Sequence, residues 1–87
     1  MTTQPATHEA QLIATDNASI QTTLKTIPAT ASNATKCHAM QACDRAAAAL
    51  MRAAIAEQAH DPDIRARNMV MYRNNLDRAR EIIRAGK

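Results

Sequence analysis

Apolar residues recur along the first third of the chain with the period of a helix. Starting at Ala6, the positions of this series follow at alternating spacings of four and three residues, which places them on one helical face. The members of the series are Ala10, Ile13, Asn17, Ile20, Leu24 and Ile27, and Asn17 is polar. Pro28 cannot continue a helix, so the pattern predicts a first helix over residues 6–27.

The second predicted helix follows a connection of small polar residues. Residues 28–35 read PATASNAT, and Ser32 or Asn33 in this stretch can cap a helix. The alanine-rich sequence that follows predicts a helix over residues 33–59. We expect its buried face to consist of Met40, Cys43, Ala47, Leu50, Met51, Ala54 and Ile55.

The clearest helix signals in the chain surround a proline near residue 60. Asp61 can cap a helix, Pro62 suits the first helical position, and Asp63 suits the positive end of the helix dipole. Gly86 is typical of a residue that follows a helix C-terminus, and Arg84 is a favourable cation in the last turn. These signals predict a third helix over residues 62–85.

Three amphipathic helices joined by short connections predict an all-α fold. Short loops make sequence neighbours pack against each other, so we expect a small antiparallel three-helix bundle that forms a single domain over residues 1–87. Thr22, Thr23 and Thr26 have poor helix propensity, so the first helix is expected to order by packing on the other two.

Composition supports a helical protein that lies outside the membrane. Tyr72 is the one aromatic residue, and alanine makes up about a quarter of the chain, which disfavours sheet. No apolar run approaches the roughly 20 residues of a membrane span, and residues 1–10 lack the basic and apolar regions of a signal peptide. We therefore expect a cytoplasmic protein without a membrane partner.

Two cysteines and a histidine lie close together in residues 36–45, KCHAMQACDR, which raises the question of a metal or redox site. On a helix, Cys37 and Cys43 are separated by about 240° and about 9 Å, so they point away from each other. A disulfide needs Cα atoms within about 7 Å, and zinc needs converging ligands. We expect reduced thiols without a metal, and Cys43 as a small buried hydrophobe.

Motifs that would indicate an enzyme are missing from the sequence. It contains no glycine-rich phosphate loop, and no serine or cysteine comes with a plausible base. We therefore expect neither catalysis nor a cofactor.

Positive charge is concentrated after Pro62. Seven of the eleven Lys and Arg residues lie there, opposed by three acidic residues. One interpretation is a solvated face with pairs such as Arg73 and Asp77. The other is an anionic partner, either nucleic acid or a protein whose surface is acidic or normally holds nucleic acid. Without aromatic stacking residues or a reading motif, direct nucleic-acid binding is expected to be weak at most.

The third helix is therefore the predicted partner surface. Its arginines at positions 73, 80 and 84 fall within about 40° of each other on a helical wheel, and Met69, Val70 and Met71 cannot all face one core. The asparagines at positions 17, 68 and 75 fit either a buried network or the edge of an interface, and a homo-oligomer is compatible with this pattern. The predicted partner-binding residues are Arg73, Arg80, Arg84, Val70, Met71 and Asn75.

Two family resemblances bear on function. The run Ile13-Ala14-Thr15-Asp16-Asn17, the stop at Pro28, the alanine-rich second helix and the closing Leu76-x-x-Ala79-x-x-Ile82 resemble the layout of small helical anti-CRISPR proteins, which inhibit type II-C RNA-guided nucleases. Asp61-Pro62 followed by Leu76-x-x-Ala79-x-x-Ile82-Ile83 is also similar to the helical co-chaperones of type III secretion needles.

Both resemblances imply a non-enzymatic protein that occupies another protein's surface. They lead us to expect a phage-type or mobile-element inhibitor of a host nuclease first and a secretion co-chaperone second. A small basic nucleic-acid-binding protein is the alternative from a different functional class.

Overall fold

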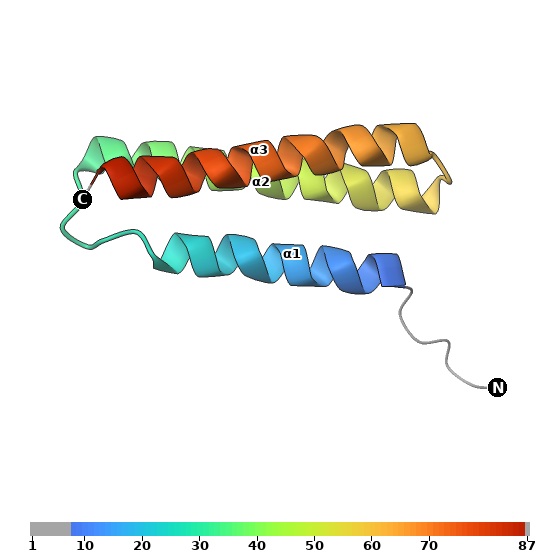
Figure 1. The fold of residues 1–87 in the computed structure, drawn as a ribbon, viewed down its shortest axis with the longest axis horizontal. Coiled ribbons are helices and arrows are strands. Elements are labelled where there is room, and N and C mark those ends of the chain that lie inside the picture. The colour runs from blue at the N-terminus through green and yellow to red at the C-terminus, as the bar shows by residue number, and fades with distance from the viewer. Residues whose placement is uncertain (1–7, 87) are drawn as a thin grey trace.

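The computed structural model describes residues 8–86 of the chain, with side chains described from Asn17 onward. Within this range it contains three helices and no strand: α1 (His8–Lys25), α2 (Asn33–Gln58) and α3 (Pro62–Ala85). The three helices lie along the long axis of the molecule, with α2 antiparallel to both α1 and α3 (Figure 1). The prediction of a small antiparallel all-α bundle is confirmed.

The helix boundaries lie close to those predicted from local signals. The first helix ends at Lys25 rather than at residue 27, because the N–H groups of Thr26 and Ile27 donate to carbonyls only three residues back, at 3.0 and 3.3 Å. The predicted start at residues 6 and 7 lies outside the described residues. The helices α2 and α3 begin at the predicted residues, and α2 ends one residue earlier than predicted.

Both predicted N-terminal caps are present. The Ser32 hydroxyl accepts a hydrogen bond from the Thr35 N–H at 3.1 Å, and Asp61 Oδ1 accepts one from the Ile64 N–H at 3.1 Å. Each bond satisfies a backbone donor that has no partner within its own helix. Pro62 occupies the first turn of α3, where its missing N–H is not needed.

The turn between α2 and α3 closes with a left-handed residue. His60 has a φ of 56°, the one positive φ of a non-glycine residue in the described part of the chain. The Asp61 N–H donates to Ala56 O at 2.8 Å, and the His60 N–H donates to Glu57 O at 3.1 Å. These two bonds form a Schellman motif, which usually carries glycine at the position of His60.

The interface between α2 and α3 is built on a row of alanines. We call Ala39, Ala42, Ala46, Ala49, Ala53 and Ala56 the alanine row; they alternate at spacings of three and four and are all buried. Buried residues of α3 complement them: the larger Met69, Tyr72, Leu76 and Ile83, together with Ala79. Small side chains on one helix let the larger side chains of the other approach closely, so the pair packs like a short coiled coil.

The predicted buried face of the second helix is therefore only partly right. Cys43 and Leu50 are buried beside the alanine row, and Ala47 and Ala54 are half-buried. The side chains of Met40, Met51 and Ile55 are instead exposed. The prediction followed the large apolar residues, whereas the closest helix contact uses the small ones.

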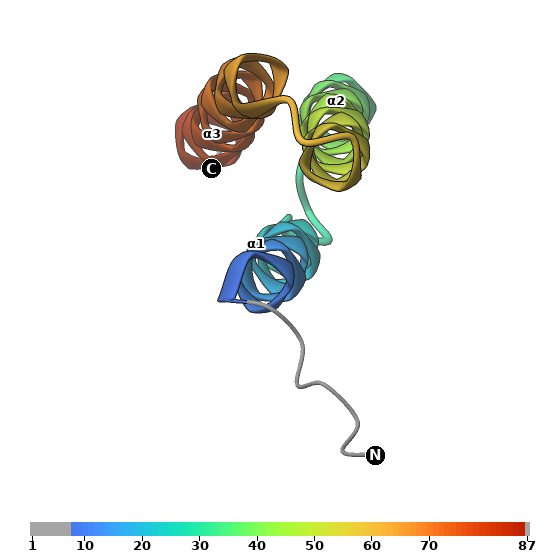
Figure 2. The ribbon, with the colours of Figure 1, turned by 90° about the vertical axis from the view of Figure 1, so that its right-hand side faces the viewer.

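One side of the α2–α3 pair is covered by α1 (Figure 2). Ile20 is 2% exposed and belongs to the same core cluster as Cys43 and Leu50, and Leu24 packs against that cluster. Thr23 is also buried, and its hydroxyl donates to Ser19 O at 2.8 Å, so burial leaves this polar group bonded. In the described range, Asn17 of the apolar series is exposed.

Candidate partner-binding surface

The two edges of the alanine row differ in exposure. At one edge, Cys43 and Leu50 are 1% and 3% exposed because they lie in the cluster that contains Ile20 of α1. At the other edge, Arg45 and Arg52 are exposed. No other element of residues 8–86 lies on that second side of the α2–α3 pair (Figure 2).

Large apolar side chains are exposed along this second side. Ile55 of α2 and Ile64 of α3 are 63% and 47% exposed, and both line one hollow of about 280 Å³ between the helices. Arg52, Ala59 and Asn68 also line this hollow. Met71 lies seven residues after Ile64, hence on the same side of α3, and it too is exposed.

A second hollow lies farther along the junction between α2 and α3, which we call the seam. It has a volume of about 150 Å³ and is lined by His38 and Arg45 from α2 and by Arg78 and Ile82 from α3. Because His38, Arg45 and Arg52 are seven residues apart along α2, they form one row on the helix surface. The two hollows therefore belong to one continuous surface, which we call the open face.

The open face is defined by exposed or edge positions on both sides of the seam. Its members are His38, Arg45, Arg52, Ile55 and Ala59 from α2 and its C-cap, with Ile64, Asn68, Met71, Asn75, Arg78 and Ile82 from α3.

Two asparagines of α3, Asn68 and Asn75, mark the border between the exposed part of this face and the core. Asn68 is 7% exposed, and its side-chain Nδ2 donates to Ile64 O at 2.9 Å. Asn75 is half-buried, and its Nδ2 donates to Met71 O at 2.8 Å. Each amide therefore satisfies a donor within its own helix and lies beside the open face.

Charge on the open face is positive. The arginines at positions 45, 52 and 78 line its two hollows, together with His38. Asp61 is the one carboxylate among the lining residues, and it lies at the turn, where its oxygen caps α3. Apolar side chains concentrate near the turn, whereas the cations extend along the seam.

The six predicted partner-binding residues do not share one face. Arg73, Arg80 and Arg84 lie about 160° around α3 from Met71 and Asn75, at 100° per residue. Arg80 and Arg84 instead line a hollow of about 150 Å³ with Thr26, beside the end of α1. Val70 is exposed between the two groups.

The ion pair of Asp77 also differs from the Arg73–Asp77 pair considered from the sequence. Arg80 approaches Asp77 at 3.8 Å, at a spacing of three residues. The two side chains are 48% and 73% exposed, so this ion pair contributes little to stability.

Sequence reasoning identified Met71 and Asn75 but missed the α2 half of the open face. The signal that could have found it is the spacing of the alanine row, because that row shows which side of α2 meets α3. Once the row is taken as the interface, Arg45 and Arg52 fall along its edge.

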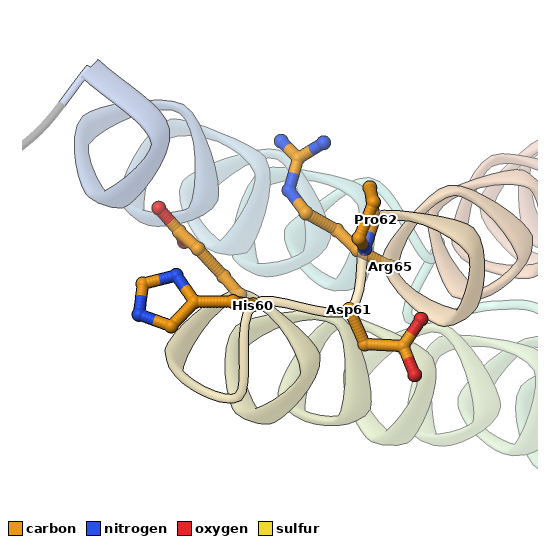
Figure 3. A pocket seen from close by; sticks show the side chains of 5 residues that line it. His60, Asp61, Pro62 and Arg65 are labelled. Atoms are coloured by element: carbon orange, nitrogen blue, oxygen red, sulfur yellow. The ribbon is translucent and has the colours of Figure 1, made fainter.

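A third hollow lies at the α2–α3 turn and contains several polar residues. It has a volume of about 320 Å³ and is lined by Glu57, His60, Asp61, Pro62 and Arg65. Figure 3 shows the His60 ring and the Asp61 carboxylate pointing in opposite directions from the turn. Since the Asp61 oxygen also accepts the Ile64 N–H, its geometry serves the helix cap rather than a pairing with His60.

The two cysteines are free thiols in different environments. Cys43 is buried, as predicted, and Cys37 is exposed. Burial raises the pKa of the Cys43 thiol above its ordinary value, and the neighbouring Asp44 carboxylate raises this pKa further. Among the residues that the structure describes, no three His, Cys, Asp or Glu side chains gather as metal ligands would.

Comparisons with protein-family models, with curated proteins and with solved structures find no match to this chain. Within the described part of the chain, no helix has the length and apolar character needed to cross a membrane.

Proposed function

We propose that this chain is a non-enzymatic module that binds a partner protein through the open face. The observation that carries the proposal is the exposed apolar hollow between Ile55 and Ile64. Apolar side chains gathered around a concave seam lose unfavourable contact with water when a partner covers them. Arginines at the border of such a surface suit the polar rim of a protein interface.

This proposal changes the predicted surface. Met71 and Asn75 remain part of it, whereas Arg73, Arg80 and Arg84 lie on the side of α3 near α1 and are left out. Val70 is left out as well, because it lies about 100° around α3 from Met71, on the side away from Ile64.

The family layouts suggest an order among partner classes. We place a host RNA-guided nuclease first, so that the chain would act as a phage-type inhibitor, and a secretion-needle subunit second. Both roles require a protein that occupies another protein's surface.

Nucleic acid is the alternative partner from a different class. The arginines of the open face could contact phosphates, but the exposed Ile55, Ile64 and Met71 would gain little from a phosphate backbone. We expect at most a micromolar, salt-sensitive gel shift without sequence preference. Nanomolar, sequence-selective binding at physiological salt would favour the alternative.

Affinity capture from a host extract tests the proposal. The full chain is immobilised, the extract is treated with nuclease, and bound proteins are identified by mass spectrometry. The proposal predicts a specific protein that survives nuclease treatment and is lost when Ile55 and Ile64 are both replaced by Asp. Recovery of nucleic acid alone, or of no specific protein, would contradict it.

A further inference from the structure

We infer that the open face binds an acidic amphipathic helix of about twenty residues. This inference rests on the proposed function and names the class of partner segment. It follows from the shape of the seam, from its charge and from the position of its apolar residues.

The shape of the seam suits a helix. The open face lies along the junction of two antiparallel helices, and a third helix packs into such a junction at a small crossing angle. From His38 to Ala59 the face extends about 32 Å at 1.5 Å per residue, which is the length of about twenty helical residues. An occupant of this kind would lie across the α2–α3 pair from α1.

The charge of the seam selects an acidic helix. Arg45 and Arg52 lie seven residues apart in one row of α2, and Arg78 of α3 lines the smaller hollow with Arg45. Carboxylates on both flanks of a docked helix would lie near these guanidinium groups, which favour carboxylate partners. Asp61 lies at the α2–α3 turn, so its repulsion of carboxylates on the docked helix is confined to one end of the open face.

The apolar residues fix the central stripe of the partner. Ile55 and Ile64 border the larger hollow, so a leucine or isoleucine of the docked helix would enter there. Met71 extends the apolar contact toward Asn75. The expected partner pattern is therefore an apolar residue at every third or fourth position, flanked by Glu or Asp.

A second copy of this chain is a poorer occupant. Two open faces placed together would bring the arginine rows of both copies into one interface, and like charges in that position oppose association. Nucleic acid is also a poorer fit, because it would leave Ile55 and Ile64 against phosphate or water.

Synthetic helical peptides test the inference directly. The probe is a peptide of about twenty residues with leucines at helical spacing and glutamates on both flanks; its matched control carries lysine in place of every glutamate. Binding to the full chain is measured by fluorescence anisotropy at low and physiological salt. We expect the Glu peptide to bind at least about tenfold more tightly than the Lys peptide. Equal binding of the two peptides would overturn the inference.

Variants of the chain locate the site. Replacing Arg45 and Arg52 by Glu should weaken the Glu peptide about tenfold, as should Ile55→Asp with Ile64→Asp. The matched control replaces Arg73 and Arg80 by Glu, which changes the net charge equally on the side of α3 near α1. If the control pair weakens the peptide as much as the Arg45 and Arg52 pair, the inferred site is wrong.

Three further outcomes are decisive. Sedimentation that shows a dimer broken by the Ile55 and Ile64 substitutions would assign the open face to a second copy and overturn the inference. The inference would also be overturned by an oligonucleotide that displaces the Glu peptide, if it binds the variant with Asp at positions 55 and 64 as tightly as it binds the wild type. A native protein captured as proposed, together with no binding of the Glu peptide, would refute the inference and leave the proposed function standing.

Discussion

His60 adopts a left-handed backbone at the end of α2, although its neighbour Ala59 has an ordinary φ of −82°. A side chain in the left-handed region costs roughly 1 kcal/mol relative to glycine. The sequence HDPD predicted the start of α3 correctly, but it gave no indication that His60 would take this conformation.

Replacing His60 by Gly should stabilise the protein. Glycine adopts the positive φ without strain, although it also gains entropy in the unfolded chain, so we expect a net increase of about 0.5 to 1 kcal/mol in the free energy of unfolding. Urea denaturation followed by circular dichroism measures this change. The control is Ala59→Gly, which relieves no strain and should lower stability; a loss of stability in both variants would refute the strained turn.

The two thiols should differ strongly in reactivity. Cys37 is exposed, whereas Cys43 is buried and its pKa is raised by that burial, so Cys43 stays protonated near neutral pH. A thiol reagent should modify one cysteine in the folded protein and both after denaturation. Peptide mapping should assign the first modification to Cys37, and rapid labelling of Cys43 in the native state would contradict its burial.

The raised pKa of Cys43 also predicts the direction of a pH effect. The folded pKa lies above the unfolded value, which is near the ordinary value of 9.0. The contribution of the protonated thiol to stability is therefore present below about pH 9 and is lost as the pH rises through the folded pKa. Cys43→Ala should remove this alkaline loss while lowering stability by about 1 kcal/mol through lost packing.

At the scale of the helices, boundaries were predictable and the buried face of α2 was not. Ser32, Asp61 and Pro62 act through local geometry, so the sequence displays them directly. Which face of α2 is buried depends on how closely α3 approaches. Alanine is only weakly hydrophobic, so a row of alanines does not stand out in the sequence. The prediction placed Met40 and Ile55 on the buried face because they are large and apolar. The predicted face therefore lies around α2 from the alanine row.

The alanine row should tolerate no larger side chain. Ala46 is 0% exposed at the interface with α3, so Ala46→Leu forces extra volume into a packed contact and should destabilise the protein by roughly 1 to 3 kcal/mol. The same change at the exposed Ala66 should be nearly neutral, because leucine and alanine have similar helix propensities. Urea midpoints that fall equally in both variants would exclude close packing as the cause.

For the whole molecule, the arrangement of the helices explains why a partner surface exists. The helices α2 and α3 contain 26 and 24 residues and form a long hairpin, and α1 covers one side of it. The open face lies on the opposite side, where the described residues place no helix. A docked partner helix would cover this side, so that the α2–α3 pair would be packed on both sides.

The sequence could not reveal this asymmetry. Charge and an apolar sector wider than one contact requires were visible in α3, and they led to the correct expectation that Val70 and part of the sector lie outside the core. Which arginines lie beside Met71 depends on where α1 packs. The arginines of α2 that border the open face were therefore missed, and those of α3 near α1 were chosen.

The most direct test compares two exposed apolar residues on the same helix. Ile64 and Val70 are 47% and 52% exposed, but only Ile64 lines a hollow of the open face. Each is replaced by Asp in the full chain, and binding to the captured partner protein is measured by biolayer interferometry, with thermal unfolding as the check on folding. The proposal predicts that Ile64→Asp weakens binding at least about tenfold while Val70→Asp changes it little, and that both variants remain folded. Unchanged binding by folded Ile64→Asp, or an equal loss with Val70→Asp, would contradict the open face as the partner surface.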